Sequence, residues 1–88
     1  MTNKAFYAFC KEQRKVEPDS HKEEVLNVVY GFMWECSVSK EGVNSFIESM
    51  IYKATCKGQS ERVAAYEWLR DVFAGKVSVA APAQETLF

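Results

Sequence analysis

The feature that most constrains the fold is an unbroken apolar stripe in the middle of the chain. Between residues 43 and 54, apolar side chains recur at steps of three and four residues: Val43, Phe46, Ile47, Met50, Ile51 and Ala54. This spacing follows the turn of an α-helix and places all of them on one side of it. Because an amphipathic helix buries its apolar side against neighbours, the segment predicts a fold built by helix packing.

The same segment carries start and stop signals. Ser39 is a favoured N-cap residue. Lys53 and Lys57 lie near the far end, where cations interact favourably with the negative pole of a helix. Gly58 can adopt the left-handed backbone conformation that closes a helix. The predicted third helix therefore follows Ser39 and ends before Gly58.

A first helix is predicted from Asn3 to about Lys15. Thr2 or Asn3 can cap its start, and Pro18 disfavours helical backbone for the residue before it. One side of this segment carries apolar residues, namely Phe6, Phe9 and Cys10. The segment is therefore amphipathic, like the third.

A second helix is predicted from His21 to about Cys36. Ser20 and Glu23 have capping-box spacing, in which the serine side chain accepts a bond from the backbone N–H of Glu23 and the glutamate reaches back. Apolar residues cover more than one side of this segment: Val25, Leu26, Val28, Val29, Phe32, Met33 and Trp34. This pattern predicts a central helix with several neighbours, or one that also meets a partner.

A fourth helix is predicted after Ser60, its cap, and it ends at Gly75. Its inner side is formed by Ala65, Trp68, Leu69, Val72 and Phe73. No alternating strand pattern occurs along the chain. The sequence therefore predicts an all-α fold, a small bundle of about four short helices in residues 1–76. Residues 77–88 lack a helical period and contain Pro82, so we expect an extended, mobile tail there.

No set of residues predicts catalysis, a metal site or a cofactor. His21, the only histidine, lies in the first turn of a predicted helix in solvent, where a general base gains nothing from burial. Cys10, Cys36 and Cys56 are far apart and form no C-x-x-C pair, which is typical of reduced thiols that pack as small hydrophobes. No glycine-rich phosphate loop occurs. We therefore expect a non-enzymatic protein.

Targeting signals are also lacking in the sequence. The first residues do not contain the apolar region of a signal peptide, and no apolar run approaches the length that crosses a membrane. The sequence therefore predicts a cytoplasmic protein that does not insert into a membrane.

A short basic patch raises the question of nucleic-acid binding. Lys11, Arg14 and Lys15 lie close together on the first predicted helix, with Tyr7 one turn before Lys11. Such a patch can hold phosphates while the aromatic ring stacks on a base. However, acidic residues are interleaved with it, and eleven basic against twelve acidic residues leave a net charge of −1. The sequence therefore favours an ordinary solvated surface and predicts no direct nucleic-acid binding.

The second predicted helix offers a candidate protein interface. Its apolar residues exceed what one inner side can bury, and Tyr30 and Trp34 are the two large aromatics among the surplus. They could hold a second protein, such as a replication or repair enzyme. In the alternative interpretation the same surplus drives self-association of the chain.

The stretch "QETLF" places two hydrophobic residues after a flexible, proline-containing segment. Gln84, two variable residues, then Leu87 and Phe88 resemble the pentapeptide motif by which bacterial polymerases and repair proteins dock on the sliding clamp. The resemblance implies that Gln84 enters a small polar subsite and that Leu87 and Phe88 fill the main hydrophobic pocket. Glu85 and Thr86 depart from the residues common at those places, leucine and aspartate or serine, which bears on affinity.

The resemblance implies a non-enzymatic binding module of bacterial or phage DNA metabolism, with the sliding clamp as its protein partner. Its role would be that of an accessory factor or of an inhibitor. One alternative is a structural or oligomeric helical protein, or a phage inhibitor of another host machine, whose tail packs on its own bundle. A lesser alternative is a C-terminal ligand of PDZ domains, since Thr86 stands two places before a terminal hydrophobe.

Overall fold

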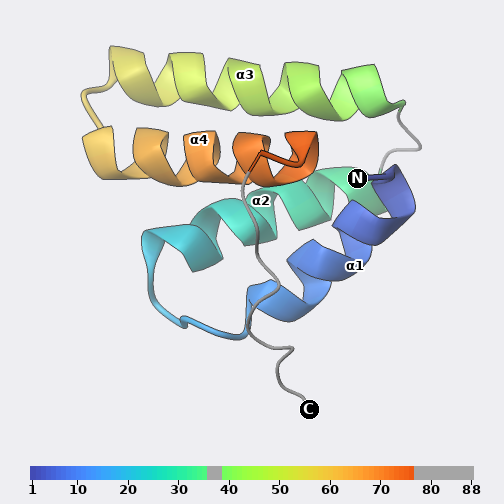
Figure 1. Ribbon diagram of the computed structural model, residues 1–88. Helices are drawn as coiled ribbons and strands as arrows, with labels where there is room; N and C mark the ends of the chain where they lie inside the picture. Colours follow the sequence, from blue (N-terminus) through green and yellow to red (C-terminus); the bar gives the residue numbers. More distant parts are fainter. Residues whose placement is uncertain (36–38, 77–88) are drawn as a thin grey trace.

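The computed structural model describes residues 1–35 and 39–76, and these residues form four α-helices (Figure 1). The helices are α1 (Asn3–Gln13), α2 (His21–Glu35), α3 (Lys40–Cys56) and α4 (Ser60–Ala74). No strand occurs within the described residues. The prediction of an all-α bundle of about four helices is confirmed. Helix α1 ends two residues earlier than expected, and the boundary expected at Cys36 lies outside the described residues.

Helix α4 is the common neighbour in this arrangement. Helices α3 and α4 lie side by side and antiparallel, joined by a short turn, and the other side of α4 packs on α2 (Figure 1). Helix α1 packs on α2 in turn. The N-terminal ends of α2 and α4 lie at the same end of the bundle, because His21 on α2 contacts Glu61 on α4.

One hydrophobic core is shared by all four helices. Its buried members are Phe6, Cys10, Val25, Leu26, Val29, Val43, Ile47, Ala65, Tyr66, Leu69, Val72 and Phe73. The predicted inner side of α4 is correct except at one place. Tyr66 is 1 % exposed, whereas Trp68 is only partly buried at the edge of the core. The two rings exchange roles because α4 is buried on two sides, against α3 and against α2, so its inner side is wider than one stripe.

The predicted ends of α3 are confirmed. The Ser39 side chain accepts a hydrogen bond of 3.0 Å from the backbone N–H of Gly42. At the other end, Gly58 has a φ of 70°. Its N–H donates to the Thr55 carbonyl at 3.1 Å, and the N–H of Gln59 donates to the Ala54 carbonyl at 3.0 Å. These two bonds form a Schellman motif, which satisfies carbonyls at the end of the helix.

Two helix starts differ from the prediction. The Ser20 side chain accepts from the N–H of Glu23 at 3.0 Å as expected, but the Glu23 carboxylate accepts from the N–H of Asp19, not from that of Ser20. Asp19 has a φ of 65°, and this left-handed turn brings its own N–H to the carboxylate. Helix α4 already includes Ser60, and its N-cap residue is Gln59, which makes no side-chain cap bond. Gln59 also donates the Schellman bond that closes α3, so the turn between the two helices is short and α4 starts one residue earlier than predicted.

Removing side-chain volume from α4 should destabilise the whole bundle. Leu69 is fully buried between α4 and its neighbours. We expect Leu69→Ala to lower the free energy of unfolding by about 2–5 kcal/mol, because it leaves a cavity in the shared core. Chemical denaturation followed by circular dichroism measures the change. Tyr52→Ala on the outer side of α3, where the ring is 70 % exposed, should change stability by less than about 0.5 kcal/mol. Equal losses in the two variants would contradict this description of the core.

Candidate functional site

Two tyrosines join α1 to α2 near the surface of the bundle. The rings of Tyr7 and Tyr30 stack with their centroids 5.0 Å apart and an angle of 23° between their planes. The Tyr7 hydroxyl donates a hydrogen bond of 3.4 Å to the Tyr30 hydroxyl. This bond, with a contribution from burial, raises the pKa of Tyr7 above its ordinary value, so the donor stays protonated. The stacked and hydrogen-bonded pair of half-buried rings therefore links α1 to α2.

Arg14 extends this contact toward the end of α1. Its guanidinium carbon lies 4.6 Å from the centroid of the Tyr30 ring, within the range of a cation–π interaction. One terminal nitrogen donates to the side-chain oxygen of Asn27 at 3.3 Å, and Nε donates to the Lys11 carbonyl at 3.2 Å. The guanidinium is thus held over the ring from two sides.

These contacts bring the predicted basic patch and the predicted protein interface together on one surface. We call this surface the α1–α2 face, and its residues are Lys4, Tyr7, Lys11, Arg14, Lys15, Tyr30 and Trp34. On α1 the steps of three and four residues keep Lys4, Lys11 and Arg14 on the side of Tyr7. On α2, Trp34 follows Tyr30 by four residues and lies on the same side of the helix.

The cations of this face have no acidic partners among the side chains that the structure describes. Lys4, Lys11, Arg14 and Lys15 make no ion pair there, whereas the arginines of α4 are each paired with a carboxylate. Of the two acids interleaved with the patch, Glu17 pairs with Lys22 at 3.8 Å. Glu12 is five residues from Tyr7 and lies on another side of α1 from that ring. It precedes Lys15 by three residues and forms no ion pair among the described side chains.

Trp34 is the most exposed aromatic ring of this face. It is 70 % exposed, although a large apolar ring is ordinarily mostly covered. The other tryptophan, Trp68, differs in its surroundings. Its ring lies 6.1 Å from that of Phe9 and beneath the ammonium group of Lys22, at 4.6 Å. Trp34 therefore offers an exposed ring one helical turn beyond Tyr30, the residue that Arg14 contacts.

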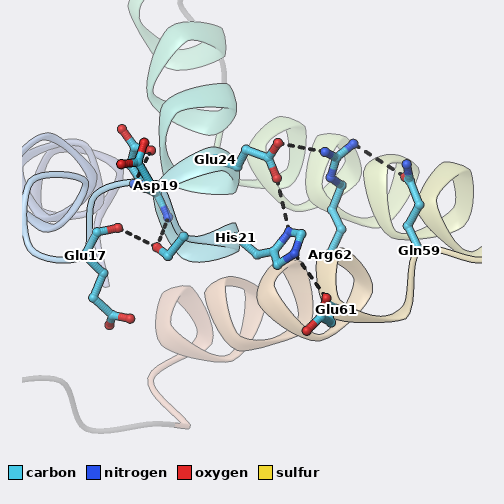
Figure 2. A network of polar contacts seen from close by, with 9 residues as sticks. Glu17, Asp19, His21, Glu24, Gln59, Glu61 and Arg62 are labelled. Atoms are coloured by element: carbon cyan, nitrogen blue, oxygen red, sulfur yellow. Dashed lines mark hydrogen bonds and ion pairs between the residues drawn. The ribbon is translucent and has the colours of Figure 1, made fainter.

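A polar network lies at the end of the bundle where α2 and α4 begin (Figure 2). The Nδ1 atom of His21 lies 3.2 Å from Glu24 and its Nε2 atom lies 3.2 Å from Glu61. Arg62 donates to Glu24 at 2.8 Å and also contacts Gln59. His21 is indeed half exposed in the first turn of a helix. Because both ring nitrogens face carboxylates, the histidine links two helices, and its non-catalytic role stays a prediction.

The described cysteines occupy two different environments. Cys10 is buried in the core, and burial raises the pKa of its thiol to about 12. Cys56 is exposed in the last turn of α3. Within the described residues, no group of three or more acidic, histidine or cysteine side chains is arranged to hold a metal ion. Cys10 is therefore a packing residue.

The predicted clamp-binding residues Gln84, Leu87 and Phe88 lie outside the described residues, and so does the tail as a whole. The site residues that the structure does place were only partly found from the sequence. Lys4 was missed, although its three-residue step to Tyr7 signals its position. The approach of Arg14 and Tyr7 to Tyr30 left no local signal, since it depends on how two helices pack.

Lowering the pH should weaken the link between α2 and α4. The hydrogen bond from Arg62, with help from His21, lowers the pKa of Glu24 below its ordinary value of 4.5 against a smaller opposing effect of burial. A carboxylate with a lowered folded-state pKa stabilises the fold above its unfolded pKa, and this stability is lost as pH falls through the folded value. We expect the stability advantage of the wild type over Glu24→Gln to shrink from pH 6 to pH 3, as measured by urea denaturation.

The variant Arg62→Met provides the control for this comparison. It keeps the carboxylate but removes the cation that holds the pKa down, so Glu24→Gln made in that background should show less pH dependence. An advantage of the wild type that stays constant or grows toward pH 3 would contradict the assignment.

Thiol labelling should separate the two described cysteines. At pH 8 the Cys10 thiol is almost entirely protonated and covered, and the thiolate is the reactive form. We expect iodoacetamide to modify Cys56 in the native protein and to reach Cys10 only after unfolding in urea, with peptide mass spectrometry as the readout. Equally fast modification of Cys10 in the native protein would show that the α1 core contact is open.

Comparisons with known proteins add no relative. No family model matches the chain, and neither the curated proteins nor the solved structures contain a significant match to it. Within the described residues, no helix is both long and apolar enough to cross a membrane. The functional interpretation therefore depends on the α1–α2 face and on the residues of the tail motif themselves.

Proposed function

We propose that this protein is a non-enzymatic binding module of bacterial or phage DNA metabolism that docks on the sliding clamp through Gln84, Leu87 and Phe88. The observation that carries the proposal is the Gln-x-x-Leu-Phe sequence itself. Its position supports it. Helix α4 ends at Ala74, nine residues before Ala83, because Gly75 has a φ of 80° and the N–H groups of Gly75 and Lys76 form Schellman-type bonds to carbonyls of the last turn.

The chemistry of the motif fits a shallow pocket on a protein. Leu87 and Phe88 can each contribute about 1.5–3 kcal/mol when they are fully buried in a partner. Gln84 adds a directional hydrogen bond through its amide. Ordering the segment offsets part of this gain, so an affinity in the micromolar range is expected for the motif alone. Residues 77–83 can span roughly 20 Å when extended, which leaves room for the bundle beside the clamp.

The helical bundle supplies the second half of this function. A tethered body with its own binding face brings a second ligand to the clamp at high effective concentration. The α1–α2 face is the best candidate, because it combines an exposed ring with unpaired cations. An accessory factor would use it to hold that ligand, whereas an inhibitor would use the body to cover the clamp.

One observation favours a different class of function. Trp34 on α2 and Tyr52 on α3 are each 70 % exposed, and exposed aromatics of this size can pair two copies of a chain. In this second candidate the protein is an oligomeric helical protein, and the tail motif is part of its own packing. The mass of the protein between 5 and 500 µM, from light scattering, separates the two.

The clamp proposal can be tested with the full chain and purified bacterial sliding clamps from several hosts. We expect micromolar binding by surface plasmon resonance, a loss of about a hundredfold in Leu87→Ala/Phe88→Ala, and a loss of about tenfold in Gln84→Ala. A known clamp-binding peptide should compete. The matched control is Val77→Ala/Val79→Ala, which removes apolar groups from the same segment outside the motif and should bind normally.

Two results would overturn the proposal. One is the absence of binding to every clamp at 500 µM. The other is equal binding by the wild type and Leu87→Ala/Phe88→Ala, since the contact would then belong to another part of the chain.

A further inference from the structure

The α1–α2 face combines two kinds of group that single-stranded nucleic acid requires. Such ligands are bound by cations that follow the backbone and by aromatic rings on which bases stack. Lys4 and Lys11 are exposed on α1, and Lys15 is exposed in the turn after it. Trp34 supplies an exposed ring on the neighbouring helix. The stretch of α1 from Lys4 to Lys11 is about 10 Å long at the rise of an α-helix, and Lys15 follows in the turn beyond it.

We propose that the α1–α2 face binds single-stranded nucleic acid, with a base stacked on Trp34 and phosphates held by Lys4, Lys11 and Lys15. The inference goes beyond the proposed function. It uses no residue of the tail, and it holds whether or not the chain docks on the sliding clamp.

The fixed groups of the face support this assignment. Arg14 is held over Tyr30, with its guanidinium carbon 4.6 Å from the ring centroid, by its bonds to Asn27 and to the Lys11 carbonyl. A guanidinium in this position keeps its positive charge at the surface without a carboxylate partner. The lysines beside it are exposed and unpaired among the described side chains, so they can meet phosphates without first breaking an ion pair.

Charge complementarity favours nucleic acid over an acidic peptide. A peptide carboxylate would satisfy the lysines, but an acidic peptide would need a separate aromatic or apolar side chain to cover Trp34. A nucleotide carries an anionic group and a flat ring in one unit. Single strands are favoured over duplex DNA because a base must be unstacked to reach the ring.

The fold also explains why the sequence of the first helix predicted an ordinary solvated surface and not a binding site. Along the chain the basic residues are accompanied by one aromatic residue, Tyr7, and by Glu12 and Glu17. In the structure α2 brings Tyr30 against Tyr7 and Arg14, with Trp34 one turn beyond it, and Glu17 is paired with Lys22. The α1–α2 face is therefore richer in cations and in aromatic rings than the composition of the whole chain indicates.

The first test is a titration of the full-length protein with a fluorescently labelled oligothymidylate of about 15 nucleotides in 50 mM salt. We expect dissociation constants on the order of 10–100 µM, as for non-specific binding, together with quenching of tryptophan fluorescence. Trp34→Ala should weaken binding about tenfold. Trp68→Phe should keep both the affinity and the quenching, because the stacked ring is Trp34.

The second test isolates the phosphate contacts with a charge-matched control. Lys11→Gln/Lys15→Gln and Lys53→Gln/Lys57→Gln each remove two exposed lysines four residues apart at the C-terminal end of a helix. Only the first pair belongs to the α1–α2 face. We expect it to weaken binding and to reduce the slope of log K against log salt by about 1.4, since each phosphate contact on a single strand contributes about 0.7. The control pair of substitutions should leave the affinity and the salt slope unchanged.

Several results would overturn the inference. These are no binding at 500 µM protein, equal losses in the two lysine pairs, normal binding by Trp34→Ala, and duplex DNA or polyglutamate binding as tightly as the single strand. Leu87→Ala/Phe88→Ala should bind the oligonucleotide normally. Loss of binding in this variant would assign the contact to the tail and would also reject the proposal. The clamp experiment is independent of this result. Circular dichroism confirms that each variant is folded.

Discussion

The hydrophobic contact of α4 with both α2 and α3 holds the rest of the structure in place. Tyr66, Leu69 and Phe73 of α4 are buried at this junction. The Phe73 ring also lies 4.4 Å from that of Phe6, which ties α1 into the same core. Because α1 otherwise packs mainly on α2, its position depends on where α4 has placed α2. The arrangement of Tyr7 against Tyr30 is thus a consequence of core packing.

Charge is distributed unevenly over this nearly neutral molecule. Arg62 of α4 pairs with Glu24 of α2, and Arg70 of α4 pairs with Glu48 of α3 at 3.2 Å. Exposed pairs of this kind contribute little to stability individually. Their effect is to balance charge where α4 meets its neighbours, while the cations of α1 remain unpaired among the described side chains. A net charge of −1 therefore coexists with a local basic surface.

The two proposals assign recognition elements of different kinds to this protein. At the centre of the α1–α2 face, Tyr7, Tyr30 and Arg14 are held by stacking and hydrogen bonds, whereas its lysines and Trp34 are exposed. The Gln-x-x-Leu-Phe motif follows the end of α4 and uses a few side chains of a short peptide. In combination, a clamp tether and a weak single-strand contact would reinforce one another through effective concentration.

The sequence by itself determined the helices, their approximate ends and the apolar stripe of α3, because caps, glycine stops and helical periodicity act within a few residues. It also contains the Gln-x-x-Leu-Phe residues on which the clamp proposal rests. The tertiary structure decided that Tyr66 is buried and that Trp68 lies at the edge, since α4 has two neighbours. It also placed Tyr30 beneath the guanidinium of Arg14, with Trp34 one turn farther along α2. Such contacts between helices depend on packing angles, which no local pattern specifies.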